Sequence, residues 1–338
     1  MANEVEKYNL LALSDIEKIN GFADADIEKI NGLEFSVFVA DKGIFSYGAE
    51  IGVGATNKSQ LVNNSGVMAS EDNAVGTARG YNSGCEYGLG LAIFFAGENA
   101  VGGYVSITNL VNTSGVVGAD VTGVGEIRAG QTGCAYGDDK GIFAYGYNTE
   151  GGFHRISISS LVNSSGVVSS DVTGVGVARR NAAACEYGGD KGIFLFGDAA
   201  GGDGGLITTR NLVNNSGVIA DSVSGAGTGR EGPAACNYSS DRDKGVVWAG
   251  LAGAGRTAVS NLISNSGVVS ADVSAVGTAV SLTSGCEYGT DKGILAHGYQ
   301  STLTQGLHFS HLVNNSGVVG ADVTGIDNGR NAPGAAGY

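Results

Sequence analysis

The chain has 338 residues, a formal net charge of −14, 59 glycines, 2 prolines and only 15% charged residues. This acidic balance argues against nucleic-acid binding, which needs clustered Lys and Arg, and against docking on anionic lipid. Glycine without a Gly-x-y period excludes collagen, and 42% hydrophobic residues are too many for a disordered chain. What remains is a compact all-β protein with many tight turns, because glycine reaches the positive φ at which strands reverse.

Residues 1–34 come first in the chain and contain an internal echo. The stretch Ser14-Asp-Ile-Glu-Lys-Ile-Asn-Gly21 recurs eleven residues later, from Ala25 to Gly32. Each copy is interpreted as one helical turn, capped by Ser14 or Asp26 and stopped by Asn-Gly. Two turns this short are unstable alone in water, so we expect them to fold against the rest of the chain or a partner. We predict an attachment segment whose apolar residues are Ile16, Ile19, Ile27 and Ile30.

The same N-terminal region does not resemble a secretion signal. Its apolar run from Leu10 to Leu13 is short, and Glu4 and Glu6 precede it where a signal peptide carries basic residues. No apolar run in the sequence approaches the roughly 18–20 residues of a membrane helix. We therefore expect neither a signal peptide nor membrane insertion.

From residue 41 to residue 338 the chain consists of six copies of one unit of about 50 residues. The motif (Asn/Ser/Thr)-Ser-Gly-Val marks every copy, and its glycines follow one another at intervals of 49 to 51 residues. A cysteine holds one position in five copies, and Ala336 holds it in the sixth. Such a period indicates units that bury their apolar faces against one another. The marker glycines are Gly66, Gly115, Gly166, Gly217, Gly267 and Gly317, and the cysteines are Cys85, Cys134, Cys185, Cys236 and Cys286.

The pattern inside one copy is typical of strands. Cys185 and Tyr187 alternate with a polar residue, a Gly-Gly-Asp turn follows, and an apolar run then ends at Gly197. A third strand is expected to end at Val213, and an Asn-Asn-Ser-Gly turn leads to a short fourth strand at Ile219. Four short antiparallel strands per copy are typical of a propeller blade.

The two ends of the repeated region predict how it closes. The first copy starts at its second strand, at Lys42, whereas the last copy ends on a first strand over residues 334–338. Pairing these fragments completes a sixth blade and leaves no exposed sheet edge, which an open solenoid would not achieve. The sequence therefore predicts an all-β fold with a short N-terminal extension, residues 1–34, and a closed six-bladed β-propeller, residues 35–338.

Five of the six copies also open the first strand with an arginine, followed by small residues, a turn with Gly and Asp, and an apolar strand that ends in Gly. In these features the unit resembles the kelch repeat of β-propellers. It departs from that pattern in two ways: the paired Gly-Gly after the second strand is mostly a single Gly, and the only tryptophan, Trp248, lies in a second strand. The arginines are Arg79, Arg128, Arg179, Arg230 and Arg330, and Val280 breaks the series.

The Ile-Glu-Lys-Ile-Asn-Gly module and the Asn-Ser-Gly-Val and Asp-Val-Thr-Gly-Val-Gly motifs are similar to segments of virion structural proteins of tailed phages, notably of marine and cyanobacterial hosts. This resemblance covers nearly the whole chain. It implies a virion protein, made in the host cytoplasm and present in multiple copies, that attaches to other virion proteins through residues 1–34. It would act as a tail or fibre appendage that binds a host-surface glycan or protein, or as a capsid or tail decoration protein that contacts only virion proteins. A cellular kelch-type adaptor and a glycan-active propeller enzyme are the alternatives from other classes.

The segment between the second and third strands varies in length and content from copy to copy, and all six should emerge on one face. Variable loops on a constant scaffold often carry recognition, and aromatic residues suit sugar stacking and protein contacts. Ordinary drift in exposed turns explains the variation equally well. The candidate binding residues are Tyr104, Tyr147, Phe153, His154, Arg155, Tyr299, His308 and Phe309.

The repeated polar positions have structural interpretations. The cysteines occupy equivalent positions of different copies, too far apart for disulfides, so we expect buried free thiols. The Asn-x-Ser triplets match glycosylation sequons, but turn-forming Asn and Ser explain them. An acidic residue stands five positions after five of the six marker glycines, with Ser222 in the fourth copy, and is expected to cap an Asx turn, because one carboxylate per copy makes a poor calcium site. The asparagines are Asn63, Asn112, Asn163, Asn214 and Asn314, and the acidic residues are Glu71, Asp120, Asp171, Asp272 and Asp322.

Nothing in the repeat indicates a catalytic site. A nucleophile with its base, or a matched pair of carboxylates, should appear as residues that break the repeat. His308 and His311, three apart on a strand, would face opposite sides and would not chelate one metal. We therefore expect a non-enzymatic protein without metal or cofactor.

Overall fold

The computed structural model describes residues 41–338 apart from 74, 150–153, 200–204, 275, 301–308 and 326, together with the backbone of six two-residue strands within residues 7–34. The chain divides into two compact units, Met1–Val39 and Ala40–Tyr338. The described residues form many small antiparallel sheets and no α-helix. The predicted all-β class is thus confirmed.

The six short strands of the first unit pair as three hairpins. The pairs are β1 (Lys7–Tyr8) with β2 (Leu11–Ala12), β3 (Lys18–Ile19) with β4 (Phe22–Ala23), and β5 (Lys29–Ile30) with β6 (Leu33–Glu34). In the second and third hairpins the two residues between the strands are Asn-Gly in sequence, the pair that two-residue hairpin loops favour. The predicted helical turns over residues 14–21 and 25–32 are therefore wrong where they fall on described residues, because β3 and β5 are strands.

In the second unit each copy contributes a first, second and third strand that pair antiparallel in this order. The first strands are β13 (Ser83–Tyr87), β16 (Thr132–Tyr136), β21 (Ala183–Tyr187), β25 (Ala234–Asn237), β28 (Ser284–Tyr288) and β33 (Gly334–Gly337). The second strands are β7 (Gly43–Ser46), β14 (Leu91–Asn99), β17 (Lys140–Ala144), β22 (Lys191–Leu195), β26 (Gly245–Ala252) and β29 (Lys292–Ala296). The third strands are β10 (Lys58–Val62), β15 (Tyr104–Val111), β20 (Ser159–Val162), β23 (Arg210–Val213), β27 (Gly255–Ile263) and β30 (Phe309–Val313).

The expected fourth strand consists of isolated bridges to the third strand, such as Val111 with Val117 and Val213 with Ile219. Four copies add a second bridge further along, such as Thr108 with Val121. Two copies add a short outer strand, β11 (Asp72–Asn73) on β10 and β31 (Val323–Thr324) on β30. The remaining short strands are β8 (Ala49–Glu50), β9 (Gly54–Ala55), β12 (Arg79–Gly80), β18 (Tyr147–Asn148), β19 (His154–Arg155), β24 (Arg230–Glu231) and β32 (Arg330–Asn331).

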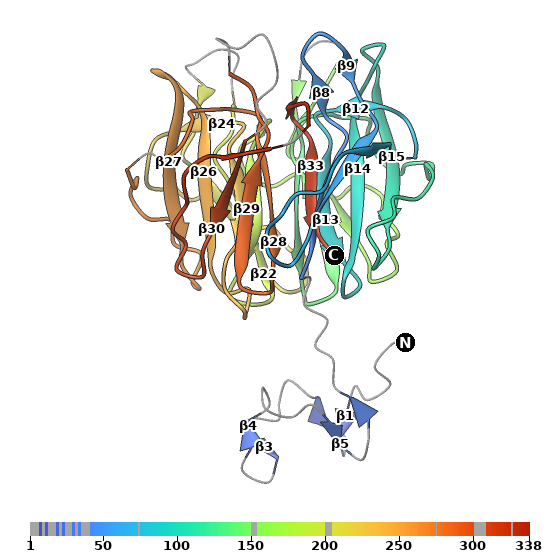
Figure 1. Cartoon of the computed structure of the whole chain (residues 1–338), viewed down its shortest axis with the longest axis vertical. Helices are drawn as coiled ribbons and strands as arrows, with labels where there is room; N and C mark the ends of the chain where they lie inside the picture. The colour runs from blue at the N-terminus through green and yellow to red at the C-terminus, as the bar shows by residue number, and fades with distance from the viewer. Residues whose placement is uncertain are drawn as a thin grey trace. The chain divides into compact units, whose positions relative to one another are not determined.

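The two ends of the second unit pair in one sheet, with strand order β11-β10-β7-β33. Gly334 pairs with Ser46 and Gly337 with Gly43. β32 likewise pairs with β8. In Figure 1 the red C-terminal strand β33 lies beside β13, with which it is in contact. This pairing of the two ends is the one that the sequence predicts.

The six first strands contact one another in cyclic order: β13, β16, β21, β25, β28, β33 and again β13. Backbone hydrogen bonds follow the same cycle. A residue with positive φ lies just before each first strand. In five copies the N–H of this residue donates to the carbonyl of the residue at the same position in the preceding copy, and in the remaining copy the N–H of the next residue does so. The donor and acceptor pairs are Tyr81 and Ala332, Gly130 and Tyr81, Asn181 and Gly130, Gly232 and Asn181, Thr283 and Gly232, and Ala332 and Leu282.

The core consists of six apolar clusters, several of which join neighbouring copies. All five cysteines are buried and free, as predicted. Each thiol lies against the glycine that opens a neighbouring second strand: a Cβ built on Gly192 would lie 2.6 Å from Cys134 Sγ, and one on Gly141 2.5 Å from Cys85 Sγ. The cysteine and the glycine of the Lys-Gly-Ile-Phe motif are thus two halves of one contact between copies.

The arginine that precedes the first strand in five of the copies is buried and also joins copies. Arg179 lies 3.9 Å from the ring centroid of Tyr145, and Arg79 lies 3.7 Å from that of Tyr47. Arg79 further donates to the carbonyl of Ala96 and to Asn109 Oδ1. Stacking and hydrogen bonds together compensate for the cost of burying the guanidinium.

Candidate functional site

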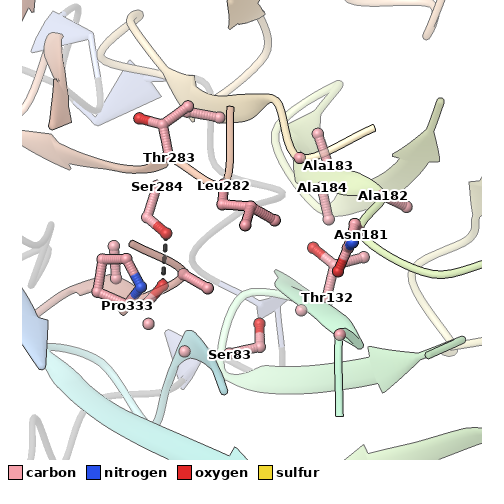
Figure 2. Close-up of a pocket in the computed structure, with 18 of the residues that line it drawn as sticks. Ser83, Thr132, Asn181, Ala182, Ala183, Ala184, Leu282, Thr283, Ser284 and Pro333 are labelled. Carbon is pink, nitrogen blue, oxygen red and sulfur yellow. Dashed lines mark hydrogen bonds between the residues drawn. The ribbon is translucent and has the colours of Figure 1, made fainter. Parts of the chain in front are cut away.

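A pocket lies where the chain enters the six first strands, and all six copies contribute to its lining. Figure 2 shows Ser83, Thr132, Asn181 and Ser284 around it, with the Ser284 hydroxyl donating to the carbonyl of Pro333. The cavity volume is about 90 Å³, whereas pockets that enclose a drug-sized ligand measure roughly 300–1,000 Å³. The pocket thus has room for a few water molecules and not for a sugar ring.

Three tyrosines cluster beside this pocket. Tyr81 lines the pocket itself, Tyr147 lies in β18, and Tyr104 opens β15. The Tyr104 and Tyr147 rings are nearly perpendicular, with centroids 5.4 Å apart, and the Tyr81 and Tyr147 centroids are 6.5 Å apart. Edge-to-face contacts of this kind orient aromatic rings. Tyr147 is buried, whereas Tyr81 and Tyr104 are partly exposed.

An ion-pair network borders the tyrosines. The buried carboxylate of Asp198 accepts hydrogen bonds from Arg155 Nη2 at 2.5 Å and from Arg180 Nε at 3.0 Å. Arg180 also lies 3.5 Å from Glu231, to which Asn181 donates a hydrogen bond. The Arg180 guanidinium is 5.6 Å from the Tyr147 ring centroid. The network thus holds the variable segments of neighbouring copies in fixed positions relative to one another.

The tyrosine hydroxyls remain protonated at neutral pH. Burial raises the pKa of Tyr147 and of Tyr81, and burial together with Glu98 raises the pKa of Tyr104. A neutral phenol both donates and accepts hydrogen bonds but is a poor nucleophile. The cluster therefore suits recognition of a polar ligand better than covalent chemistry.

Three of the predicted binding residues, Tyr104, Tyr147 and Arg155, come together in this cluster. Tyr299 instead lies against Arg256, whose guanidinium is 4.5 Å from the Tyr299 ring centroid. His154 is exposed in β19, opposite Asn148. Phe153 and His308 lie outside the described residues.

Phe309 corrects the prediction. The sequence places it in a variable loop, but it begins β30, which pairs with β29, and its ring packs against an apolar core cluster. Phe309 is therefore a partly buried residue of a strand and not of a loop, and its role in binding stays a prediction.

Sequence reasoning missed Tyr81, Arg180, Asp198 and Glu231. Tyr81 holds a position where other copies carry Gly, Asn, Leu or Ala, and all six residues there have positive φ. Tyrosine at such a position is unusual and is a signal for closer attention. Arg180 is a second arginine directly after the repeated Arg179, and no other copy has one there.

A second cluster lies further along the first strands. Glu86, Glu186 and Glu287 follow the marker cysteine in alternate copies and line a small cavity there. Arg242, from the turn between β25 and β26, forms ion pairs with all three. Two signals in the sequence could have revealed it: glutamate recurs only in every second copy, and the turn that carries Arg242 is two residues longer than its counterparts.

Of the predicted attachment residues, Ile19 and Ile30 lie in β3 and β5. Ile16 and Ile27 lie outside the described residues. The structure therefore leaves the attachment segment as a prediction.

The repeated polar residues fall into two groups. The asparagines of the Asn-x-Ser triplets hold their own turns as predicted: Asn112 Oδ1 accepts hydrogen bonds from the N–H groups of Ser114 and Val116. The acidic residues bind another copy instead of capping an Asx turn, because Asp120 accepts hydrogen bonds from the N–H and hydroxyl of Thr77. The Asx-turn prediction is therefore wrong, since the partner lies in the preceding connection between copies.

Comparison with known proteins adds no identification: no protein-family model matches the chain, and no curated protein is significantly similar to it. The described part of the chain contains no group of three or more His, Cys, Asp or Glu side chains arranged to hold a metal ion. Within those same residues no helix is long and apolar enough to cross a membrane.

Proposed function

We propose that the second unit is a closed six-bladed β-propeller and that it serves as a rigid, non-enzymatic binding scaffold. The cyclic order of the first strands, the matching cycle of backbone hydrogen bonds and the pairing of β33 with β7 support the closed ring. Closure of the ring pairs β7 with β33 and leaves each blade only a short outer edge, which suits a rigid scaffold.

One observation supports the binding role. Tyr104, Tyr147 and Arg155 come from variable segments and lie together with Tyr81, Arg180 and Asp198. Each of these segments joins a second to a third strand, so that they leave the sheets at one end. The central cavity is too small to enclose an organic ligand, and recognition therefore takes place on the surface around its mouth. We propose a host-surface glycan as the ligand, since partly exposed tyrosine rings stack on sugars while carboxylates and guanidinium groups bind hydroxyls.

A glycan-binding assay tests this role. Wild-type protein and the Tyr104→Ala variant would be compared on an array of bacterial surface polysaccharides. We expect binding by the wild type and a loss of about tenfold or more on removal of the ring, which corresponds to about 1.4 kcal/mol. Tyr299→Ala is the matched control, because it removes a tyrosine from the same kind of segment outside the cluster. Equal binding by wild type and Tyr104→Ala would contradict the proposed site.

For the whole protein we propose a structural component of a tailed-phage particle, present in several copies and attached to other virion proteins through residues 1–34. Its sequence motifs support this proposal. Mass spectra of purified particles should contain the protein, and deletion of residues 1–34 should abolish its incorporation. Absence from the particles would contradict a virion role. Presence in particles without any glycan or host-protein binding would favour a decoration protein, whereas sugar release from a glycan would indicate an enzyme.

A further inference from the structure

The cluster of Glu86, Glu186, Glu287 and Arg242, here called the glutamate–arginine cluster, joins the first strands of alternate copies. Arg242 Nη2 lies 2.7 Å from Glu287 Oε1 and also pairs with Glu86, while Arg242 Nε lies 3.7 Å from Glu186 Oε2. Glu86 and Glu186 are buried, and only 13% of the side-chain surface of Arg242 and of Glu287 is exposed. Four charged groups from four parts of the chain therefore meet almost without water.

The position of Arg242 is built into the chain. Asn237, which stands where the alternate copies carry glutamate, donates to the carbonyl of Arg242 and accepts from the N–H of Glu186. Within the same turn the Ser239 hydroxyl accepts hydrogen bonds from the N–H groups of Asp243 and Lys244. The longer turn is thus folded and anchored, and it directs one guanidinium to three carboxylates.

The charges of the glutamate–arginine cluster do not balance. Three carboxylates and one guanidinium leave two negative charges if every carboxylate is ionised, and buried unpaired charge is costly. Only 6% of Glu86 is exposed, and its Oε1 accepts no hydrogen bond within the described part of the structure. Glu86 lies in the lining of a cavity of about 50 Å³. The geometry therefore calls for an additional hydrogen-bond donor that carries positive charge.

The surroundings supply no such group. The described lining of this cavity contains no Lys or His, and the intervening strands β16, β25 and β33 present Ala135, Asn237 and Gly337. The thiols of the five repeated cysteines, which lie beside these strands, are neutral, because burial raises the pKa of each. Asp138, exposed in the turn after β16, adds a further negative charge. A proton is the one cation that the carboxylates can bind without extra space or ligands.

We propose that the glutamate–arginine cluster is a proton-binding site that couples the cohesion of the six first strands to pH. A proton from solvent adds to one carboxylate, and the resulting carboxylic acid donates its O–H to a carboxylate oxygen of a neighbouring glutamate. Release of that proton to solvent reverses the step and leaves the carboxylates to repel one another across the strands.

The electrostatics agree in direction with this geometry. Burial raises the pKa of Glu186 to about 7, against the opposing pull of Arg242. Burial likewise raises the pKa of Glu287, and Glu86 adds to the effect. Because these groups interact, the proton belongs to the cluster as a whole and not to one residue.

Unfolding of the full chain at different pH values tests the proposal. Trp248 is buried and is the only tryptophan, so its fluorescence reports unfolding. We expect the urea midpoint to fall as the pH rises from about 4.5 to about 7 and to level off above that, with a slope that corresponds to about one proton more on the folded than on the unfolded chain. Glu186→Gln should flatten this dependence. Asp241→Asn is the matched control, because it removes an exposed carboxylate from the same turn without entering the cluster, and it should keep the wild-type slope.

A second measurement keeps the proposal falsifiable if Glu186→Gln does not fold. Carboxyl ¹³C chemical shifts of the folded wild-type protein, labelled on glutamate, should show at least one glutamate that titrates near neutrality instead of near its usual pKa. A wild-type profile without such a titration, or a pH slope that Glu186→Gln leaves unchanged, would overturn the proton site.

Discussion

At the scale of single residues, neighbouring copies are joined by contacts to which each copy contributes one residue of a matched pair. The glycine of Lys-Gly-Ile-Phe has no side chain because a cysteine of another copy occupies that space. A Cβ at Gly192 would meet Cys134 Sγ at 2.6 Å and the carbonyl of Ala135 at 3.3 Å. The size of the cysteine side chain thus matches the space that the missing side chain of the glycine leaves.

This contact predicts the effect of a single methyl group. Gly192→Ala should lower the free energy of unfolding by about 1–3 kcal/mol, because the extra atom overpacks a tight interface between copies. Gly253→Ala serves as the control, since a Cβ there meets nothing within 4 Å and its φ is not positive. Urea unfolding of both variants measures the difference. Equal stability of the two would show that the cysteine contact can relax at no cost.

Trp248 shows how the repeat compensates when one residue changes. The fifth arginine position is Val280, and Trp248 packs in the same core cluster as Val280. The Trp248 Nε1 donates to the carbonyl of Val276, as the Tyr47 hydroxyl does to that of Val75. The indole therefore fills the space that the arginine occupies in the other copies. It also makes the hydrogen bond that Tyr47 makes in its own copy.

At the scale of strands, the short strand β33 joins several parts of the second unit. It pairs with β7 and contacts both β13 and β28. Without it, β7 would present an unpaired edge, and two apolar clusters would lose contacts, one that of Ala336 and the other that of Ala335. Four residues thus complete a sheet that starts almost 300 residues earlier in the chain.

Truncation tests this role. Deletion of residues 330–338 should abolish cooperative unfolding and promote aggregation through the exposed edge of β7. Deletion of residues 1–39, which form a separate compact unit, should leave the unfolding of the second unit nearly unchanged. Thermal unfolding followed by circular dichroism, together with light scattering, distinguishes the two. A cooperative transition after loss of β33 would contradict closure by the chain ends.

The short strands of the first unit illustrate a limit of local patterns. Ile-Asn-Gly suits both the end of a helical turn and the loop of a two-residue hairpin. The structure has the hairpin, with Lys18 opposite Ala23 and Lys29 opposite Glu34. The absence of a long apolar-periodic run around these glycines favours the hairpin, because a single helical turn makes too few hydrogen bonds to persist.

At the scale of the whole molecule, carboxylates of two kinds set the response to pH. Those that bind the neighbouring copy are stabilised as anions: burial opposes ionisation, but hydrogen bonds from Thr77 and Asn109 outweigh it and lower the pKa of Asp120 below 3.8. Hydrogen bonds from Thr228 and Asn261 do the same for Asp272, again against burial. The pKa values of Glu186 and Glu287 in the glutamate–arginine cluster shift in the opposite direction.

These opposite shifts predict maximal stability in mild acid. A lowered folded-state pKa contributes stability above 3.8 that is lost as the pH falls through the folded value, so acid below about pH 4 should destabilise the second unit. A raised pKa acts the other way: for Glu186 the contribution is complete below 4.5 and disappears as the pH rises through about 7, for a difference of about 3 kcal/mol. Midpoints of thermal unfolding across the pH range measure both the loss of stability in acid and the loss of stability as the pH rises towards 7. Thr77→Val should change only the loss of stability in acid, because Thr77 donates to Asp120.

The repeat, its strands and the meeting of the chain ends could be derived from the sequence, because periodicity, turn residues and the incomplete first and last copies are properties of neighbouring residues. The tyrosine cluster, the Asp120 bond to Thr77 and the convergence of Glu86, Glu186 and Glu287 on Arg242 could not. These groups come from different copies, and which of them meet depends on the order in which the copies contact one another. Glutamate in every second copy is visible as a pattern in one dimension, but only the arrangement of the six first strands makes it a buried site.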